Sequence, residues 1–321
     1  MLSKKAMKAN SRTKHGLSIL AATLSVLFSA PAESQPVRAG FIYTLSSFTG
    51  AIPYNHSRVT ADRERNEIYV LYQNTVRVFN DSGMEIYQFG DNLDLGHIVD
   101  VAVDEEGDIL LLAYKDSRFG IIRCNFRGEP KSRIELRNLP SGFSDFSPNR
   151  MVYQQGNLYL ASLMGLKAVV ADREGNFKKG YDLFSLLELE EKDRGNVEMG
   201  GFSVDREGRV LTTIPVLFSA YVLSQDGKVN SFGKPGSAPG RFNVVGGIAR
   251  DSKGNYLVVD KLKAAVLVFD KSFNFVTQFG SLGYKPGNLI FPDDIAIDNG
   301  GRVYVTQMGK KGVSVYKLTY N

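Results

Sequence analysis

Read with period two, residues 244–280 contain four strand candidates that are separated by turn-forming residues. The candidates lie at 247–250, 255–260, 265–269 and 275–279 and are rich in β-branched and aromatic residues. Alternation with period two over such lengths is typical of β-strands. The first turn, Asp251-Ser252-Lys253-Gly254, begins with an acceptor for its own backbone amides and ends with a residue that tolerates positive φ. The stretch therefore predicts a small sheet of four antiparallel strands.

The same pattern recurs along the chain. We call the residue that begins each of these turns a hairpin marker, and the six markers, 42 to 51 residues apart, are Asp62, Asp104, Gln154, Asp205, Asp251 and Asp298. A single sheet of this size cannot bury both of its faces, and self-similarity at this period is typical of propellers and solenoids. Because an Asp recurs at nearly every marker, we expect these acids to cap turns and not to catalyse a reaction.

The two ends of the chain favour a ring over an open solenoid. The sixth unit has three strands, whereas the segment 41–47 stands alone before the first unit and aligns with the outer strand at 275–281. We therefore predict an all-β fold, a six-bladed β-propeller of four-stranded antiparallel blades, closed by the N-terminal strand 41–47 completing the last blade. The predicted blades lie near 57–90, 97–135, 149–183, 200–233, 245–280 and 293–321.

Two connectors carry a resemblance to a known family. Residues 233–242 and 280–292, with the segments 247–251 and 294–298 that follow them, are similar to the loops and first strands of NHL repeats. The resemblance is most specific for the last two units, and it implies a propeller from a family of binding proteins and occasional enzymes. The WD-repeat alternative is disfavoured because the chain contains no Trp.

The N-terminal segment predicts export. Basic residues precede an apolar run at 17–30, and Ala30-Pro31-Ala32 offers the small residues that a signal peptidase recognises. We expect a secretory signal peptide at 1–32, with an uncleaved anchor as the alternative, and a single propeller domain at 33–321 in the periplasm or outside the cell. The apolar run is too short to cross a bilayer, so no membrane span is expected.

The signal segment also accounts for the basic character of the chain. The sequence has 39 Lys plus Arg and 34 Asp plus Glu, and the first 32 residues include five basic residues and no acidic one. The mature protein is therefore formally neutral, which gives no support to nucleic-acid binding. We expect a monomer whose partner is a protein or a cell-envelope component.

Three features lie outside the strand pattern. Residues 181–194 have an Asp cap candidate and apolar residues at three- and four-residue spacing, which predicts a short amphipathic helix between blades. The connector 136–148 holds Phe143 and Phe146 and predicts a rim loop beside it. Cys124 is the only Cys, and its apolar neighbours predict a buried thiol without a disulfide.

Most motifs of catalysis and cofactor binding are absent from the sequence. It lacks a nucleophile elbow, a phosphate-binding loop and a haem-attachment motif. The mature chain has only His56 and His97, too few for a zinc site of three His. Residues 91–96 are rich in carboxylates but lack the alternating ligands of a calcium loop. We expect no cofactor, with calcium or another divalent ion as the alternative.

The predicted ring places equivalent residues around a central channel. Four positions before each marker, the chain carries Arg58, Asp100, Arg150, Gly201, Gly247 and Asp294, and we expect the two glycines to leave the ring open on one side. Two positions before each marker, it carries small or apolar residues that would line a narrow tunnel, namely Thr60, Ala102, Val152, Ser203, Ala249 and Ala296.

Two hypotheses fit this ring. In the first, the Arg and Asp side chains neutralise one another and fill the channel. In the second, the channel mouth is a ligand site, where Arg58 and Arg150 bind a carboxylate or another anion. The acids that would bind a cation or hydroxyl groups at this site are Asp100, Asp293 and Asp294. His97 would extend the site at the entrance to the second blade.

For the whole protein we favour a binding or scaffold module that presents a rigid propeller to a protein or cell-envelope ligand. The alternative is a hydrolase that resembles metal-dependent lactonases of six-bladed form, which hold a divalent ion in the channel. In this chain the ligands of the metal ion would have to come from Asp100, Asn149 and Asp294, with His97. The inner strands offer no Glu. The resemblance alone does not choose between a binder and an enzyme.

Overall fold

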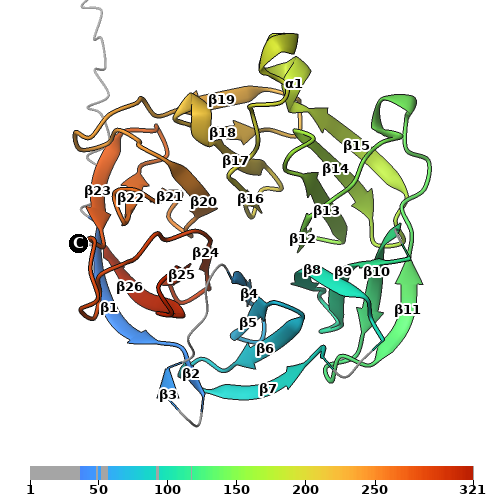
Figure 1. The fold of residues 1–321 in the computed structure, drawn as a ribbon, viewed down its shortest axis with the longest axis horizontal. Helices are drawn as coiled ribbons and strands as arrows, with labels where there is room; N and C mark the ends of the chain where they lie inside the picture. Colours follow the sequence, from blue (N-terminus) through green and yellow to red (C-terminus); the bar gives the residue numbers. More distant parts are fainter. Residues whose placement is uncertain (1–36, 48–49, 52–56, 92–93, 117, 321) are drawn as a thin grey trace, which may run out of the picture. The chain divides into compact units, whose positions relative to one another are not determined.

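Six four-stranded antiparallel sheets surround a common centre in the computed structural model of the chain (Figure 1). The structure describes residues 37–47, 50–51, 57–91, 94–116 and 118–320. The predicted signal peptide at 1–32 and His56 lie outside the described residues. The predicted fold class, an all-β propeller of six four-stranded blades, is confirmed.

Consecutive strands build the first five blades, and each blade runs outward from its first strand (Figure 1). The first three blades comprise β4 (Arg58–Asp62), β5 (Glu67–Tyr72), β6 (Thr75–Phe79) and β7 (Glu85–Phe89); β8 (His97–Val103), β9 (Ile109–Lys115), β10 (Arg118–Cys124) and β11 (Pro130–Ile134); and β12 (Arg150–Gln154), β13 (Asn157–Ser162), β14 (Lys167–Asp172) and β15 (Phe177–Asp182). The next two comprise β16 (Gly201–Val204), β17 (Val210–Ile214), β18 (Ser219–Leu223) and β19 (Val229–Phe232); and β20 (Val245–Arg250), β21 (Tyr256–Asp260), β22 (Ala265–Phe269) and β23 (Phe275–Phe279).

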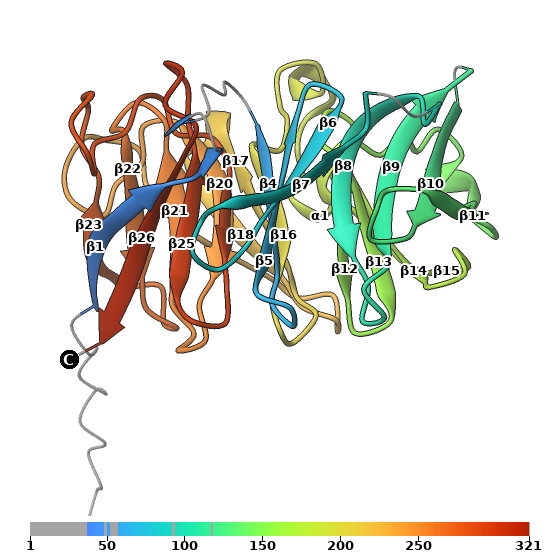
Figure 2. The same ribbon diagram turned by 90° about the horizontal axis from the view of Figure 1, so that it is seen from below.

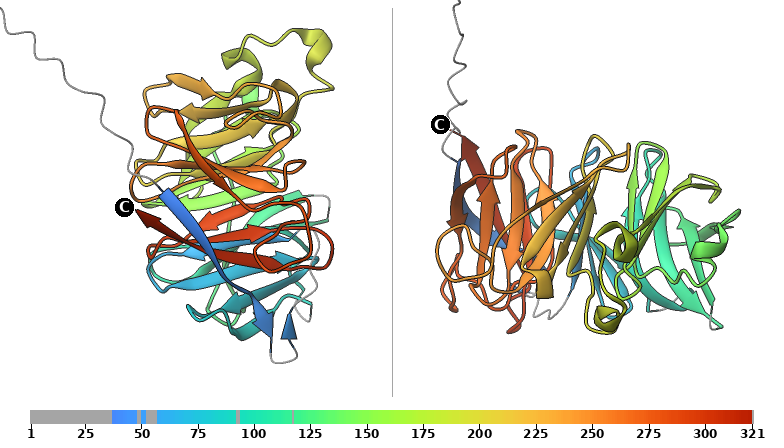
Figure 3. Two further views of the ribbon diagram at one scale, coloured as in Figure 1. Left: turned by 90° about the vertical axis from the view of Figure 1, so that its left-hand side faces the viewer. Right: turned by 90° about the horizontal axis from the view of Figure 1, so that it is seen from above.

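The sixth blade combines both ends of the described chain. Its strands are β24 (Ile295–Ile297), β25 (Arg302–Thr306), β26 (Val313–Tyr320) and, outermost, β1 (Val37–Thr44). β1 lies antiparallel to β26, with Val37 opposite Tyr320 and Phe41 opposite Tyr316 (Figure 3). The strand predicted at 41–47 therefore begins earlier and ends earlier, because β26 extends to Tyr320 and its whole length is paired. A separate two-stranded sheet, β2 (Ser46–Ser47) with β3 (Gly50–Ala51), follows β1.

Apolar side chains between neighbouring blades form the core. The strands of successive blades stand side by side in Figure 2, and their ladders join strands within a blade. Between the fourth and fifth blades, for example, the rings of Phe232 and Phe273 stack with centroids 4.8 Å apart. Cys124 is fully buried between the first two blades, as predicted. Since packing and not ladders joins the blades that the structure describes, closure of the ring by the N-terminal strand stays a prediction.

The Asp markers cap their hairpins. Asp251 Oδ1 accepts hydrogen bonds of 2.8 Å from the backbone amides of Lys253 and Asn255. The other four acids accept equivalent bonds within their own turns. Their recurrence therefore reflects turn chemistry, as the sequence predicts.

The helix predicted at 181–194 is much shorter than expected. Helix α1 covers Leu183–Leu186, and its cap is Asp182, whose side chain accepts a 3.3 Å hydrogen bond from the amide of Ser185. Tyr181 belongs to β15, and a positive φ of 51° at Glu188 ends the helical path. The other helices among the described residues are single 3-10 turns at Ser141–Phe143, Glu191–Asp193 and Pro215–Leu217. None of the helices in the described part of the chain has the length and apolar character to cross a membrane.

Candidate functional site

A cavity of about 570 Å³ lies among the inner strands of all six blades. The small or apolar positions predicted for the tunnel all line it: Thr60, Ala102, Val152, Ser203, Ala249 and Ala296. The hydroxyl of Thr60 donates to the carbonyl of Val101 at 2.9 Å, and that of Ser203 donates to the carbonyl of Ile248 at 2.6 Å. These two hydroxyls therefore connect neighbouring blades, and the tunnel wall between them is mostly apolar.

Two arginines and two aspartates of the predicted ring line the same cavity: Arg58, Asp100, Arg150 and Asp294. The carboxylate of Asp100 accepts hydrogen bonds from the amides of Val101 at 3.0 Å and Met151 at 2.7 Å. Because Met151 belongs to the next blade, Asp100 fastens the second blade to the third.

Asp294 repeats this arrangement between the sixth blade and the first. Its carboxylate accepts hydrogen bonds from the amides of Ile295 at 3.0 Å and Val59 at 3.3 Å. Both acids of the ring thus bind backbone donors, so much of their capacity to bind a ligand is already used.

A local irregularity aims Asp100 at the neighbouring blade. The pairing of β8 with β9 shifts by one residue between Ile98 and Asp100. A bulge of this kind bends a strand and redirects the side chains that follow it. The bulge therefore explains how a residue near the start of an inner strand reaches the amide of Met151.

Burial controls the protonation of these acids. It raises the pKa of Asp100 to about 7, although Arg58 and the amide of Met151 act in the opposite direction. Burial also raises the pKa of Asp294, and the charge of Arg58 again opposes the shift. Near neutral pH the ring therefore carries less negative charge than its composition indicates.

The two arginines are held less tightly than the acids. Arg58 Nη1 lies 3.8 Å from Asp294 Oδ2, and its side chain is 24% exposed. Arg150 Nη1 donates to the carbonyl of Asn149 at 2.6 Å. Among the described residues, neither guanidinium makes a hydrogen bond to a carboxylate, so both present donors and positive charge toward the cavity.

Three other predicted residues lie outside the cavity lining. His97 is exposed at the start of β8, opposite Tyr114. Asp293 pairs with Lys261 at 2.5 Å. The side-chain oxygen of Asn149 accepts a 3.1 Å hydrogen bond from the amide of Leu163. The ligand set Asp100, Asn149 and Asp294 is therefore not gathered at one point of the cavity, and a binding role for His97 and Asp293 stays a prediction.

The two glycines of the predicted ring do not open it, which corrects the expectation from the sequence. A Cβ on Gly201 would lie 2.5 Å from the carbonyl oxygen of Gly246, and one on Gly247 would lie 2.9 Å from the nitrogen of Ile295. The inner strands of the last three blades thus pack backbone against backbone. Glycine is needed there because any side chain would force these strands apart.

Sequence reasoning missed the residues at the hairpin end of the cavity. Each of them directly follows a marker, and they are Arg63, Glu105, Gln155, Arg206 and Asn299. The position directly after each marker is the signal in the sequence that identifies them. The fifth blade has Ser252 at this position, which lines a separate small cavity.

Hydrogen bonds bridge this end of the cavity. Arg206 Nη2 donates to the side chain of Asn299 at 2.6 Å, and Asn299 Nδ2 donates to the carbonyl of Arg63 at 2.6 Å. Gln155 donates to the carbonyl of Arg206 at 3.1 Å. These bonds link four blades across the hairpin end of the cavity.

Comparison with protein families supports the architecture. The family model described as a 6-bladed beta-propeller, DUF5128, matches residues 244–321. The Drosophila melanogaster protein brain tumor is 31% identical over 77 residues, which are 24% of this chain and 7% of that protein. The chain therefore spans only a small part of this relative's length. Membership of the NHL family stays a prediction.

Solved structures share the fold at low sequence identity. A protein of unknown function from Bacteroides thetaiotaomicron has a TM-score of 0.64 and 14% identity, over 89% of this chain and 77% of that chain. An auxiliary nutrient binding protein from Bacteroides ovatus has a TM-score of 0.59 and 14% identity, over 89% and 78%. A streptogramin B lyase has a TM-score of 0.55 and 12% identity, over 88% and 98%. At these identities the likeness shows the fold alone, and the fold is shared by a binding protein and an enzyme.

Proposed function

We propose that this chain is an exported, NHL-like binding module whose cavity takes an anionic group of a protein or cell-envelope component. The observation that carries the proposal is the unequal use of the four charged side chains at the cavity. Asp100 and Asp294 are bound by backbone amides of neighbouring blades, whereas Arg58 and Arg150 direct donors at the cavity without a hydrogen-bonded carboxylate among the described residues.

Chemistry favours an anion at this position. A guanidinium forms strong, charge-assisted hydrogen bonds with carboxylates and phosphates, and a partly enclosed cavity strengthens them by excluding water. The raised pKa of Asp100, which burial brings to about 7, reduces the repulsion that an arriving anion would meet.

The sequence supports the remaining parts of the proposal. The predicted signal peptide at 1–32 supports export to the periplasm or out of the cell, and the neutral mature chain does not favour nucleic acid. We propose a monomer that needs no cofactor for binding. The intact mass of the protein recovered from the exporting cell tests the localisation, and we expect its chain to begin at Glu33.

A lactonase-type hydrolase is less well supported. Its metal ligands would come from Asp100, Asn149 and Asp294, and all three side chains already accept backbone hydrogen bonds. A carboxyl group with a raised pKa is also a poorer metal ligand near neutral pH, because a metal ion binds the ionised form. We therefore rank this alternative second.

Affinity capture from a solubilised cell-envelope fraction tests the binding function. The immobilised mature protein is compared with Arg58→Gln and Arg150→Gln, and with Arg118→Gln, an exposed residue of β10, as the matched control. We expect both ring variants to retain their fold and to capture at least tenfold less of the wild-type partner, and the control to capture it normally. Equal capture by all four proteins would contradict a role for the cavity.

A further inference from the structure

The arginines that line the hairpin end of the cavity differ in their partners. Arg250, from the fifth blade, pairs with carboxylates of the fourth, because its Nη1 donates to Glu207 and, at 3.3 Å, to Asp205. Arg63 and Arg206 line the same end, and neither forms an ion pair with a carboxylate among the described residues. A guanidinium stays charged in a protein, so these two residues bring two positive charges to the cavity.

Hydrogen bonds hold both side chains in place and use few of their donors. Arg63 Nε donates to the carbonyl of Ile297 at 3.1 Å, and Arg206 Nη2 donates to Asn299 Oδ1 at 2.6 Å. The same Asn299 donates through Nδ2 to the carbonyl of Arg63 at 2.6 Å, so one amide contacts both arginines. Each guanidinium has five N–H groups, and most of them have no acceptor in the part of the chain that the structure describes.

The two positive charges oppose each other. Burial lowers the pKa of the half-buried Arg63, and the charge of Arg206 lowers it further, whereas Asp205 and Asp298 act in the opposite direction. Both acids accept hydrogen bonds within their own hairpins, for example from Arg209 Nε to Asp205 at 2.7 Å. Two like charges at one cavity, one of them half-buried, are costly without a counter-charge, so they indicate a missing anion.

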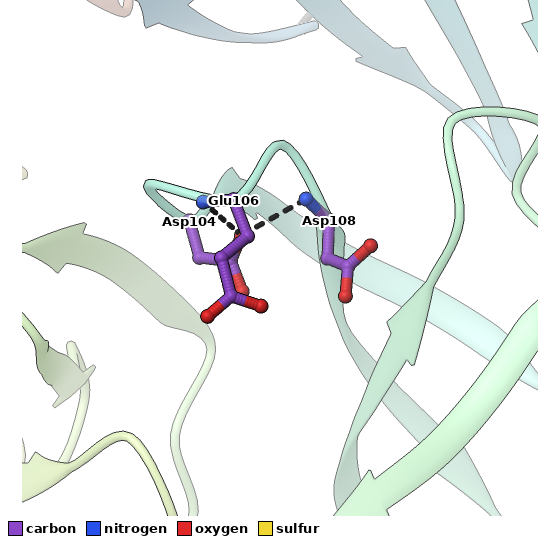
Figure 4. Close-up of side chains that lie close together, drawn as sticks. All are labelled: Asp104, Glu106 and Asp108. Atoms are coloured by element: carbon purple, nitrogen blue, oxygen red, sulfur yellow. Dashed lines mark hydrogen bonds between the residues drawn. The ribbon is translucent and has the colours of Figure 1, made fainter.

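The acids of the neighbouring hairpins do not supply this counter-charge. Glu64 and Glu105 line the cavity too, but both are exposed, and neither pairs with Arg63 or Arg206 among the described residues. Three further acids converge at the second hairpin (Figure 4), where each has a basic partner. The pairs are Asp104 with Arg123, Glu106 with Arg173 and Asp108 with Lys131.

We propose that Arg63 and Arg206 bind a doubly charged oxyanion, namely a phosphate group, at the hairpin end of the cavity. A phosphate group has a charge of about −2 and several acceptor oxygens, which match two guanidiniums from different blades. A carboxylate would balance only one of the two charges. The cavity, of about 570 Å³, has room for a free phosphate ion or for the phosphate group of a larger molecule.

This site is separate from the one at Arg58 and Arg150. Arg58 begins β4, and Arg63 directly follows that strand. The five residues from Arg58 to Arg63 span roughly 16 Å in an extended chain, so one phosphate group cannot contact both ends of the cavity. The phosphate site therefore does not depend on the function proposed for the other end.

Calorimetric titration of the mature protein with sodium phosphate, near neutral pH and at constant ionic strength, tests the site. We expect saturable binding with a dissociation constant on the order of 1 mM. Arg63→Gln and Arg206→Gln should each bind at least tenfold more weakly. Arg206→Lys keeps the charge and should lose less affinity than Arg206→Gln. Arg118→Gln, an exposed arginine of β10, is the matched control and should bind as the wild type does.

A parallel titration with glycerol 1-phosphate distinguishes the two sources of the phosphate group. Binding as tight as that of inorganic phosphate, or tighter, would assign the site to the phosphate group of a larger molecule, and weaker binding would assign it to the free ion.

Three outcomes would overturn the proposal. The first is no saturable binding of either phosphate up to about 20 mM. The second is unchanged binding in both Arg63→Gln and Arg206→Gln. The third is binding that is weakened by Arg58→Gln alone, which would place the phosphate at the opposite end of the cavity.

Discussion

The buried carboxylate of Asp100, in the second blade, accepts a hydrogen bond of 2.7 Å from the amide of Met151, in the third. Asp294 makes the corresponding contact with Val59 between the sixth and first blades, at 3.3 Å. At each of these two boundaries, an acid near the start of an inner strand thus connects one blade to the next. This explains why charged residues occur in the ring even where no ligand is needed.

The raised pKa of Asp100 predicts a particular dependence of stability on pH. Its pKa rises from 3.8 in the unfolded chain to about 7 in the folded protein, so the folded state binds more protons between these values. The free energy of unfolding should therefore fall as pH rises from 5 to 7, by on the order of 2 kcal/mol from this group.

Thermal unfolding of the wild type and Asp100→Asn between pH 5 and 8 measures this effect. The variant should be less stable at pH 5, because the amide nitrogen that replaces one oxygen of Asp100 cannot accept a backbone hydrogen bond. Its stability should also vary less with pH. Asp94→Asn, whose side chain is 90% exposed, should retain the wild-type profile. Identical profiles for the wild type and Asp100→Asn would contradict the assignment.

The close backbone contact at Gly201 predicts that adding a single methyl group there lowers the stability of the protein. In Gly201→Ala the new Cβ would meet the carbonyl oxygen of Gly246 at 2.5 Å and the Cα of Gly247 at 2.7 Å, so the inner strands must move apart. We expect a loss of about 1–3 kcal/mol in urea unfolding. Gly142→Ala, whose Cβ would meet nothing within 4 Å, should change stability by less than about 0.5 kcal/mol. Equal effects of the two changes would show that the strands are not in contact.

We predict that the thiol of Cys124 reacts only when the protein unfolds. Its side chain is fully buried, and burial raises the pKa of the thiol to about 12. Since the thiolate is the reactive form, a disulfide reagent at pH 8 should modify the native protein very slowly and modify one thiol per chain in denaturant. Rapid, complete modification of the native protein would place Cys124 at the surface instead.

The pairing of β1 with β26 predicts the result of removing β1. A mature chain shortened to begin at Leu45 lacks the outer strand of its sixth blade, so the hydrogen-bonding edge of β26 is exposed. Exposed edges of this kind pair with other chains. Light scattering after size exclusion should detect oligomers of the shortened chain and a monomer for a chain that begins at Val37. A stable monomer of the shortened chain, with an unchanged melting temperature, would contradict the role of β1.

The sequence predicts the repeat well because each blade is specified locally. The strands predicted at 265–269 and 275–279 are β22 and β23, residue for residue, since a turn bounds each of them closely. The segment 181–194 was harder to predict. Its apolar spacing suits a helix, but Leu183 and Phe184 pack into the core and Glu188 takes a positive φ, so one helical turn remains.

The cavity shows where prediction from equivalent positions succeeds and where it fails. The positions four residues before the hairpin markers predict that Arg58 and Arg150 share one cavity, because propeller symmetry brings equivalent positions together. These positions do not predict the bulge that directs Asp100 at Met151, since a one-residue shift between two strands cannot be recognised from the sequence of either strand. They also predict an opening in the ring at Gly247, where the structure has a close contact between backbones. Such a contact depends on the spacing of the blades and cannot be read from either sequence alone.

The composition of the sixth blade also governs when folding can finish. A ribosome makes β1 first and β26 last, with the strands of five other blades between them. Until β26 has been made, β1 has no partner, and the ring lacks its last blade. The sixth blade can therefore form only after β26 has been made, and such late, long-range pairing is slow. A factor that shields β1 and the unfinished blades during this interval would raise the yield of folded protein without altering its final stability.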